Sequence, residues 1–213
     1  MRHPILGLHH VTATVDEAQA DIDFYIDVLG LRLIKKTVNF DNHNVYHFYY
    51  ADERGTPGTI WTTFPYGGWG VPPGRHGEGQ ITATSFSVPG GSLEFWSTRL
   101  RERGVVPRPI PREHSGPGIA FSDPSGLVIQ LLGSDNDSRS PWTGTGIGAD
   151  AAIRGLHSVS LTIRQAAPTV NLLTGLLGFT VVDQIEHSTI LAVNGDEPGR
   201  RVQLLHGTEA LAG

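Results

Sequence analysis

The chain has 213 residues, a formal net charge of −5 at pH 7 and no cysteine. Its length allows one large or two small domains with a buried core, and the lack of cysteine excludes a disulfide framework and thiolate chemistry. Its 16 lysines and arginines are scattered rather than clustered, which argues against nucleic acid as a partner. No apolar run approaches the roughly 20 residues that span a bilayer, so we expect a cytoplasmic protein with no membrane partner.

The first segment predicts one strand, one helix and three further strands. Residues 8–15 are rich in β-branched side chains and alternate in character, which predicts a strand. A helical pattern of apolar residues follows, with Asp16 as its expected N-cap and Gly30 as its expected end. The three further strands are expected at 32–39, 45–51 and 59–64.

The same βαβββ order is expected twice more along the chain. The second copy begins at Ile81, has a helix over 92–103 that ends at Gly104, and closes with a strand over 127–132. The third copy is expected to have the following parts: a start at Gly155, a helix over about 168–177 that ends at Gly178, and a last strand over 202–205.

Alignment of the three first strands places His10, Ala83 and His157 in register. Loops rich in Gly and Pro at 66–79 and 134–149 separate the copies, and the polar run 135–141 is the best domain boundary. We therefore predict an N-terminal domain of two units in residues 1–140 and a third unit in residues 150–213, which belongs to an incomplete C-terminal domain. The expected fold class is α+β, with repeated βαβββ units whose curved mixed sheets form cups.

Several short motifs resemble a known superfamily. Residues 8–12 (Leu-His-His-Val-Thr), with Phe24-Tyr25 and Leu29-Gly30-Leu31, resemble the vicinal oxygen chelate superfamily of glyoxalases, bleomycin-resistance proteins and extradiol dioxygenases. A narrower similarity, to hydroquinone-type ring-cleaving dioxygenases, rests on four further runs: residues 51–59, residues 63–65, Tyr46-His47 and residues 154–158. The similarity covers essentially the whole chain.

The resemblance implies a nonhaem iron(II) site, with manganese(II) as the alternative metal, and a small aromatic diol and dioxygen as reactants. Its ligands would be two histidines and one glutamate, which leave three metal positions open. His10 matches the first-unit ligand, and His9 is expected in the second shell or on the other side of the strand. A homo-oligomer, a glyoxalase-type lyase or isomerase, and a metal-free small-molecule binding protein all stay open.

The second and third units do not keep these ligands. Ala83 replaces the histidine in the second unit, whose last strand carries Gln130, while the third unit combines His157 with Gln203. We expect Gln130, His157 and Gln203 to line a neutral second pocket that is structural and metal-free. The remaining histidines are expected on the surface or in the second shell: His43, His47, His76, His114, His187 and His206.

The resemblance to hydroquinone-type ring-cleaving dioxygenases implies four units, whereas three can be recognised in this sequence. If the spacing between copies continues, a fourth copy would begin at about position 231. We therefore expect the natural gene to continue by roughly 80–110 residues. That unit should supply a histidine on its first strand and a glutamate on its last. Without it, we expect weak or absent metal binding, and a first cup that aggregates or recruits a second chain.

Overall fold

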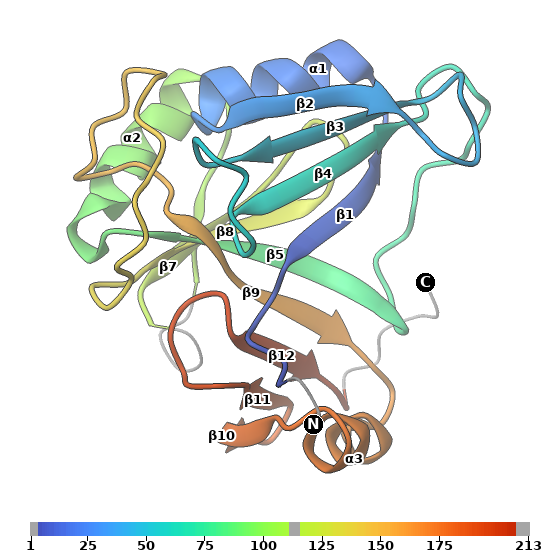
Figure 1. Cartoon of the computed structure of the whole chain (residues 1–213), viewed down its shortest axis with the longest axis vertical. Helices are drawn as coiled ribbons and strands as arrows, with labels where there is room; N and C mark the ends of the chain where they lie inside the picture. The colour runs from blue at the N-terminus through green and yellow to red at the C-terminus, as the bar shows by residue number, and fades with distance from the viewer. Residues whose placement is uncertain (1–3, 111–115, 208–213) are drawn as a thin grey trace.

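The computed structural model describes residues 4–110 and 116–207, and every structural statement below refers to these residues. The chain forms two separate sheets, as Figure 1 shows. His114, for which a surface position was expected, lies outside the described residues. None of the described helices is long and apolar enough to cross a membrane.

The first unit forms a four-stranded sheet by itself, in the order β1-β4-β3-β2. Its strands are β1 (His10–Val15), β2 (Arg32–Val38), β3 (Tyr46–Ala51) and β4 (Ile60–Pro65). β1 and β4 are parallel, and the other two pairs are antiparallel. All four strands were predicted at nearly these positions. Each is a run of strand-forming residues that is followed by Gly, Asn or Asp.

The helix of the first unit differs from the prediction at its start. It consists of α1 (Ala18–Asp23) and a π-helical turn, η1 (Phe24–Val28). Its N-cap is Glu17 without a side-chain cap, so the prediction of Asp16 as N-cap is wrong. Gly30 ends the helix as predicted, at a φ of 72° that favours glycine.

The second and third units share one eight-stranded sheet, in the order β10-β11-β12-β9-β5-β8-β7-β6. The second unit contains β5 (Gln80–Val88), η2 (Gly90–Ser92), α2 (Leu93–Glu102), β6 (Arg108–Ile110), β7 (Gly118–Ser122) and β8 (Val128–Gly133). The third contains β9 (Gly155–Thr162), α3 (Ala166–Gly175), β10 (Thr180–Ile185), β11 (Ser188–Ala192) and β12 (Arg201–Leu205). The first strands of the two units, β5 and β9, pair antiparallel and join the halves. The third helix begins and ends two residues earlier than predicted.

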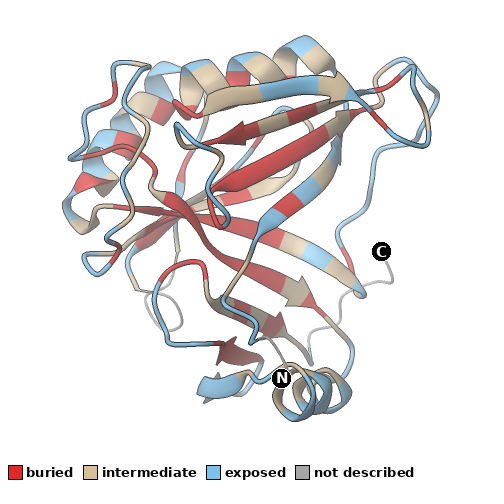
Figure 2. Cartoon of the chain, in the orientation of Figure 1, coloured by how far each residue is buried: buried red, intermediate tan, exposed pale blue. Residues whose placement is uncertain are grey.

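The core lies between the helices and the sheets, where Figure 2 shows the central strands buried. Tyr25 of η1 lies 5.5 Å from the Trp61 ring, and Trp61 lies 6.2 Å from Phe86 of β5, so one aromatic cluster joins both sheets. Trp96 and Leu100 of α2 are also fully buried. Each of these side chains stabilises the fold by about 1.5–3 kcal/mol through burial. The mixed sheets and sparse helices are those of the predicted α+β fold.

Candidate functional site

The first sheet has one face covered by the helix and one face that the helix leaves uncovered. Val11, Trp61 and Tyr50 pack against the helix, and successive residues of a strand point to opposite sides. The hydroxyl of Thr62 donates to that of Thr12 at 2.8 Å, which places both on the other side. We call this side the open face; it carries His10, Thr12, Thr14, His47, Tyr49, Thr62 and Phe64.

His10 and His9 stand at the start of the open face. Both are exposed, and their Nδ1 atoms are 3.0 Å apart, so one ring donates to the other. Burial, and then the charge of His9, lower the pKa of His10, which favours the neutral imidazole that metals bind. In the tautomer in which Nδ1 of His10 donates to Nδ1 of His9, Nε2 of His10 keeps its lone pair for a metal. A metal-bound histidine is usually held in this way through its second nitrogen.

The strand that carries His10 has a free edge. β1 pairs only with β4 among the described strands, whereas its equivalents β5 and β9 pair with each other (Figure 1). Beside this edge lies a cavity of about 560 Å³, lined by Thr12, Thr14 and residues of β5 and of the loop 71–76. The open face therefore ends at an unpaired strand, close to the candidate ligand.

The described residues fit a metal only in part. Within 4–110 and 116–207, no group of three or more His, Asp or Glu side chains could hold an ion together. His10 offers one imidazole nitrogen, and a two-histidine, one-carboxylate site needs two further donors.

One hydrogen bond recurs between the first and last strands of all three units and fixes their alignment. The pairs are Thr12–Thr62 at 2.8 Å, Ser85–Gln130 at 2.8 Å and Ser160–Gln203 at 2.9 Å. In the first strands, the hydrogen-bonded residues are Thr12, Ser85 and Ser160. The residues two positions before them are His10, Ala83 and Ser158. The equivalent of His10 in the third unit is therefore Ser158, and the prediction that His157 shares its register is wrong by one residue. His157 corresponds to His9.

Backbone hydrogen bonds support the corrected register. Gly58 donates to the carbonyl of His9 at 2.8 Å, and Gly199 donates to the carbonyl of His157 at 2.8 Å. His157 is buried beside Ser158, whose Oγ lies 3.0 Å from its Nδ1. Burial, followed by the charges of Arg201 and Arg139, lowers the pKa of His157 to about 3.

The expected second pocket is not assembled as predicted. No hydrogen bond in the described part of the chain joins His157 to Gln130 or Gln203. Each glutamine instead accepts from the serine of its own unit, and Gln203 also donates to Ser188 at 3.0 Å. The one-residue error in register explains the failure, because successive residues of a strand point to opposite faces and His157 precedes Ser158, the equivalent of His10.

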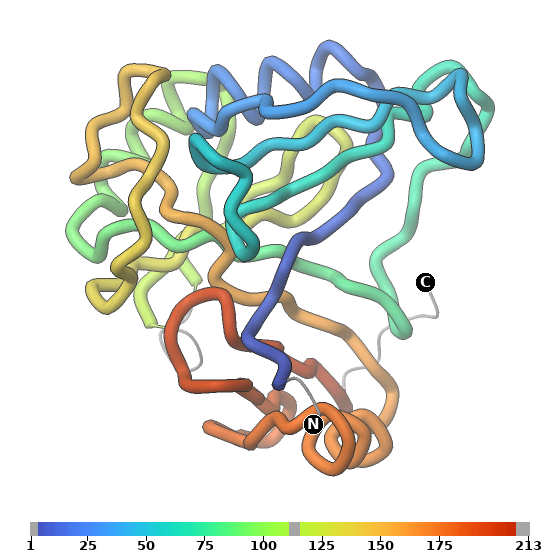
Figure 3. Tube along the Cα trace, viewed as in Figure 1, coloured from blue at the N-terminus to red at the C-terminus, as the bar shows by residue number. Residues whose placement is uncertain are grey.

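The first and third units meet at a junction with a repeated geometry, near the start of the chain (Figure 3). Leu8 donates to the carbonyl of Gly199 at 2.7 Å, and Leu156 donates to that of Gly58 at 2.8 Å. Arg139 donates to the carbonyls of Gly58 and Leu156 at 2.9 and 2.8 Å, and Asp137 holds its guanidinium. This junction fixes the backbone just before His10.

The helix-covered side of the first sheet holds two buried carboxyl groups that sequence analysis did not single out. Asp21 accepts from Tyr50 and Thr63, both at 2.7 Å, and Asp123 accepts from Tyr25 at 2.9 Å. Burial outweighs these bonds and raises the pKa of Asp21 to about 6, and that of Asp123 is also raised. Asp21 stands in an amphipathic helix, where only its place on the buried stripe distinguishes it from a surface acid.

The other histidines take different positions. His43 is exposed, His76 lies 3.1 Å from the carbonyl of Gly126, and His206 lies 3.2 Å from the hydroxyl of Thr189. His47, by contrast, lies half-buried on the open face. The signal for its position was its alternation with Tyr49 along a predicted strand.

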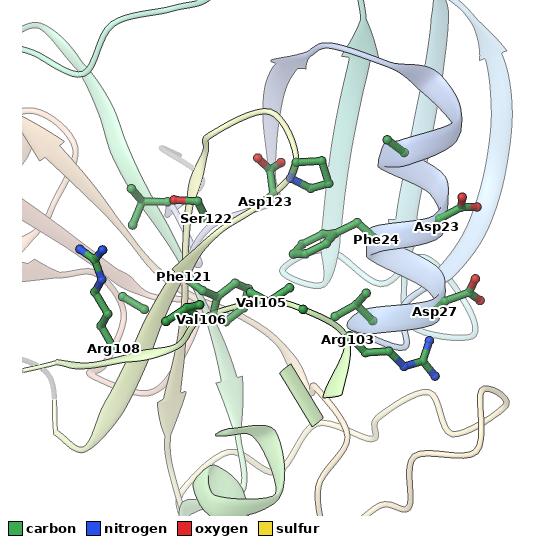
Figure 4. A pocket seen from close by; sticks show the side chains of 16 residues that line it. Asp23, Phe24, Asp27, Arg103, Val105, Val106, Arg108, Phe121, Ser122 and Asp123 are labelled. Atoms are coloured by element: carbon green, nitrogen blue, oxygen red, sulfur yellow. The ribbon is translucent and has the colours of Figure 1, made fainter. Parts of the chain in front are cut away.

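A second cavity, of about 800 Å³, is lined in part by Asp123 and by none of the histidines described above (Figure 4). It opens between the first helix, with Asp23 and Asp27, and the second unit, with Arg103, Val106 and Phe121. None of the open-face residues lines it. Its size alone therefore does not make it the functional site.

The repeated βαβββ fold, with the His9–His10 pair at the start of its first strand, agrees with the class of protein that the sequence resembles. The sequence model of the glyoxalase/bleomycin resistance protein/dioxygenase superfamily matches residues 7–131, and the chain belongs to this superfamily. MhqE of Bacillus subtilis (strain 168), named as a ring-cleaving dioxygenase, is 41% identical over 188 residues, which are 87% of this chain and 60% of MhqE. The chlorohydroquinone/hydroquinone 1,2-dioxygenase of Sphingobium indicum is 36% identical over 162 residues, which are 75% of this chain and 50% of that enzyme.

Solved structures agree with this assignment. A protein from Bacillus subtilis described as a dioxygenase superposes with a TM-score of 0.88 and 36% identity, over 96% of this chain and 64% of that one. Maize glyoxalase I superposes with a TM-score of 0.69 at 14% identity, over 95% and 68%, which shows a shared fold only. The chain spans 50–60% of the length of the two named relatives. The predicted superfamily and its hydroquinone-type branch are confirmed.

Proposed function

We propose that this chain supplies one wall of the active site of a nonhaem metal-dependent dioxygenase that cleaves a hydroquinone- or catechol-like ring. The observation that carries the proposal is the His9–His10 pair, which leaves Nε2 of His10 free on the open face. The relatives named as ring-cleaving dioxygenases, at 36–41% identity, support the same reaction class.

The metal would be iron(II) or manganese(II), held in part by Nε2 of His10. When bound, it would bring the diol and dioxygen together and let electron density pass from the ring to oxygen. His9 would hold His10 in one tautomer and one orientation through the contact between their Nδ1 atoms. The other two ligands would come from a further unit that lies against the free edge of β1.

The open face would form the wall against which the aromatic ring lies. Phe64 and Tyr49 offer flat apolar surface, and their rings lie 3.9 and 4.2 Å from that of His47. Aromatic rings prefer offset or edge-to-face contact with such surfaces, and this contact would fix the ring plane of the substrate.

The test is oxygen uptake by the protein expressed from its complete gene, loaded anaerobically with iron(II) or manganese(II). We expect uptake with hydroquinone or catechol, and its loss in His10→Ala. Isomerisation of a thiohemiacetal without oxygen uptake would indicate a glyoxalase-type enzyme instead. Tight binding of aromatic ligands by the metal-free protein, without turnover, would indicate a binding protein of the bleomycin-resistance type.

A further inference from the structure

His47 is the one histidine of the open face that the proposed metal site does not use. Its ring packs between two aromatic neighbours, with centroids 3.9 Å from Phe64 and 4.2 Å from Tyr49 and interplanar angles of 31° and 38°. Rotation of the imidazole would break both contacts. The ring is therefore held in one plane before any ligand binds.

The two nitrogens of His47 differ in their surroundings. Nδ1 lies 3.1 Å from the hydroxyl of Tyr49. Nε2 is buried and has no hydrogen-bond partner among the residues that the structure describes. Buried polar atoms are nearly always paired, because an unpaired one loses its bonds to water without replacement. Nε2 of His47 is therefore a polar atom whose partner is still to be supplied.

The charges around His47 determine its protonation. Burial lowers its pKa first, and the ammonium of Lys35 and the ring of His10 lower it further. At pH 7 the imidazole is neutral and carries a single proton. The direction of the contact between Tyr49 and Nδ1 depends on the tautomer of the ring. We assign the Tyr49 hydroxyl as the donor to Nδ1, which places the single proton on Nε2 and makes the unpaired atom a hydrogen-bond donor.

We infer that His47 is a positioning residue that donates through Nε2 to the ring oxygen of the substrate farthest from the metal. The inference rests on the proposed function above and narrows its substrate class to hydroquinones. A hydroquinone has oxygens at opposite ends of its ring, so a metal at His10 and a donor at His47 would hold both. A catechol places both oxygens at the metal and leaves His47 without a partner.

Nε2 of His47 is shielded from solvent, so a ligand reaches it only when a neighbouring side chain of the open face moves. The residue as a whole is only half-buried, so its ring borders the open face. Lys35 lies with its Nζ 5.1 Å from the centroid of the Tyr49 ring and is exposed. Because its side chain is long and flexible, it can move aside for an arriving ring.

The experiment compares two probes, hydroquinone and phenol, which differ by the distal hydroxyl. Anaerobic dissociation constants are measured for the protein expressed from its complete gene, with and without iron(II). The variant His47→Phe keeps a ring between Phe64 and Tyr49 but removes both nitrogens. The variant His43→Ala, at an exposed histidine of the adjoining loop, is the control.

We expect His47→Phe to weaken hydroquinone binding about tenfold, the effect of one lost hydrogen bond, and to leave phenol binding unchanged. His43→Ala should change neither constant. Equal effects of His47→Phe on both probes, or no effect on either, would overturn the inference. Oxygen uptake is measured in parallel: wild-type protein that binds hydroquinone through His47 but consumes no oxygen would contradict the proposed function alone.

Discussion

The first unit has the same βαβββ architecture as the second and third units, which pair with each other. It differs from them at its first strand. Each unit joins its first and last strands by one side-chain hydrogen bond, Thr12–Thr62 in the first and Ser160–Gln203 in the third. In the eight-stranded sheet the first strands pair with each other, and Ser158 stands where the first unit has His10. In the first unit the edge of β1 is free and His10 is exposed beside it.

This difference separates what the fold requires from what a reaction would require. The hydroxyl-to-amide or hydroxyl-to-hydroxyl bond recurs whether or not a histidine is present, so it belongs to the fold. The exposed imidazole and the open strand edge occur together in one unit only, among the residues described. That coincidence is the reason to assign chemistry to the first unit and a structural role to the other two.

The largest expected effect is at the junction that both regions share. Arg139→Ala removes donors from the carbonyls of Gly58 and Leu156 and leaves the carboxylate of Asp137, whose side chain is 2% exposed, without its ion-pair partner. We expect a loss of about 3–5 kcal/mol in the free energy of unfolding, measured by urea denaturation. Arg164→Ala breaks an ion pair whose arginine is 77% exposed, and should cost at most about 1 kcal/mol. Equal losses would show that Arg139 does not hold the units together.

The second prediction concerns the buried acid under the first sheet. The folded chain raises the pKa of Asp21 from 3.8 to about 6, so it holds the proton more tightly than the unfolded chain does. Stability should therefore fall as pH rises from about 4 to about 6, by at most about 3 kcal/mol, and change little above that. Asp21→Asn should remove most of this slope in unfolding free energy, with the smaller remainder due to Asp123.

Asp23→Asn, on the exposed side of the same helix, is the matched control for Asp21 and should keep the slope. A wild-type protein whose stability does not change between pH 4 and 7 would contradict the buried position of Asp21.

The third prediction tests whether the junction is equivalent on its two sides. Gly7 and Gly155 have φ angles of 152° and 145°, and an added Cβ would lie 2.7 Å from the Gly199 carbonyl and 2.8 Å from the Gly58 carbonyl. Each glycine-to-alanine change should cost about 1–3 kcal/mol, and the two costs should be similar. Thermal melts measure both. Gly91→Ala, where a Cβ meets nothing within 4 Å, is the control. If one of the two substitutions left the melting temperature unchanged, the two sides of the junction would not be equivalent.

The smallest expected effect tests the bond that all units share. Thr62→Val and Ser160→Ala each remove the donor of one such bond. Each should lower the unfolding free energy by about 1 kcal/mol, the net contribution of a neutral hydrogen bond. A much larger loss at Thr62 alone would mean that this residue serves the open face in a way that Ser160 does not serve the eight-stranded sheet.

The sequence predicted the strands, the helices and the repeat because each rests on a local signal, such as Gly30 after an apolar stripe. It also predicted that His10 lies on the first strand. The one-residue error at His157 was an error of alignment that the sequence alone could have avoided, because Gly7-Leu8-His9 matches Gly155-Leu156-His157 without a gap. The places of Asp21 and His47 needed the packed structure, because burial and a missing partner depend on residues far away in the chain.

The most direct test of the account is the iron content of two matched variants of the protein expressed from its complete gene. The variants His10→Asn and His157→Asn each replace one imidazole. Their iron content is measured after anaerobic loading with iron(II) and removal of free metal. The account predicts that His10→Asn loses the bound iron, whereas His157→Asn keeps as much iron per chain as the unaltered protein. Full iron content in His10→Asn, together with loss of iron in His157→Asn, would contradict the assignment of the metal to the first unit.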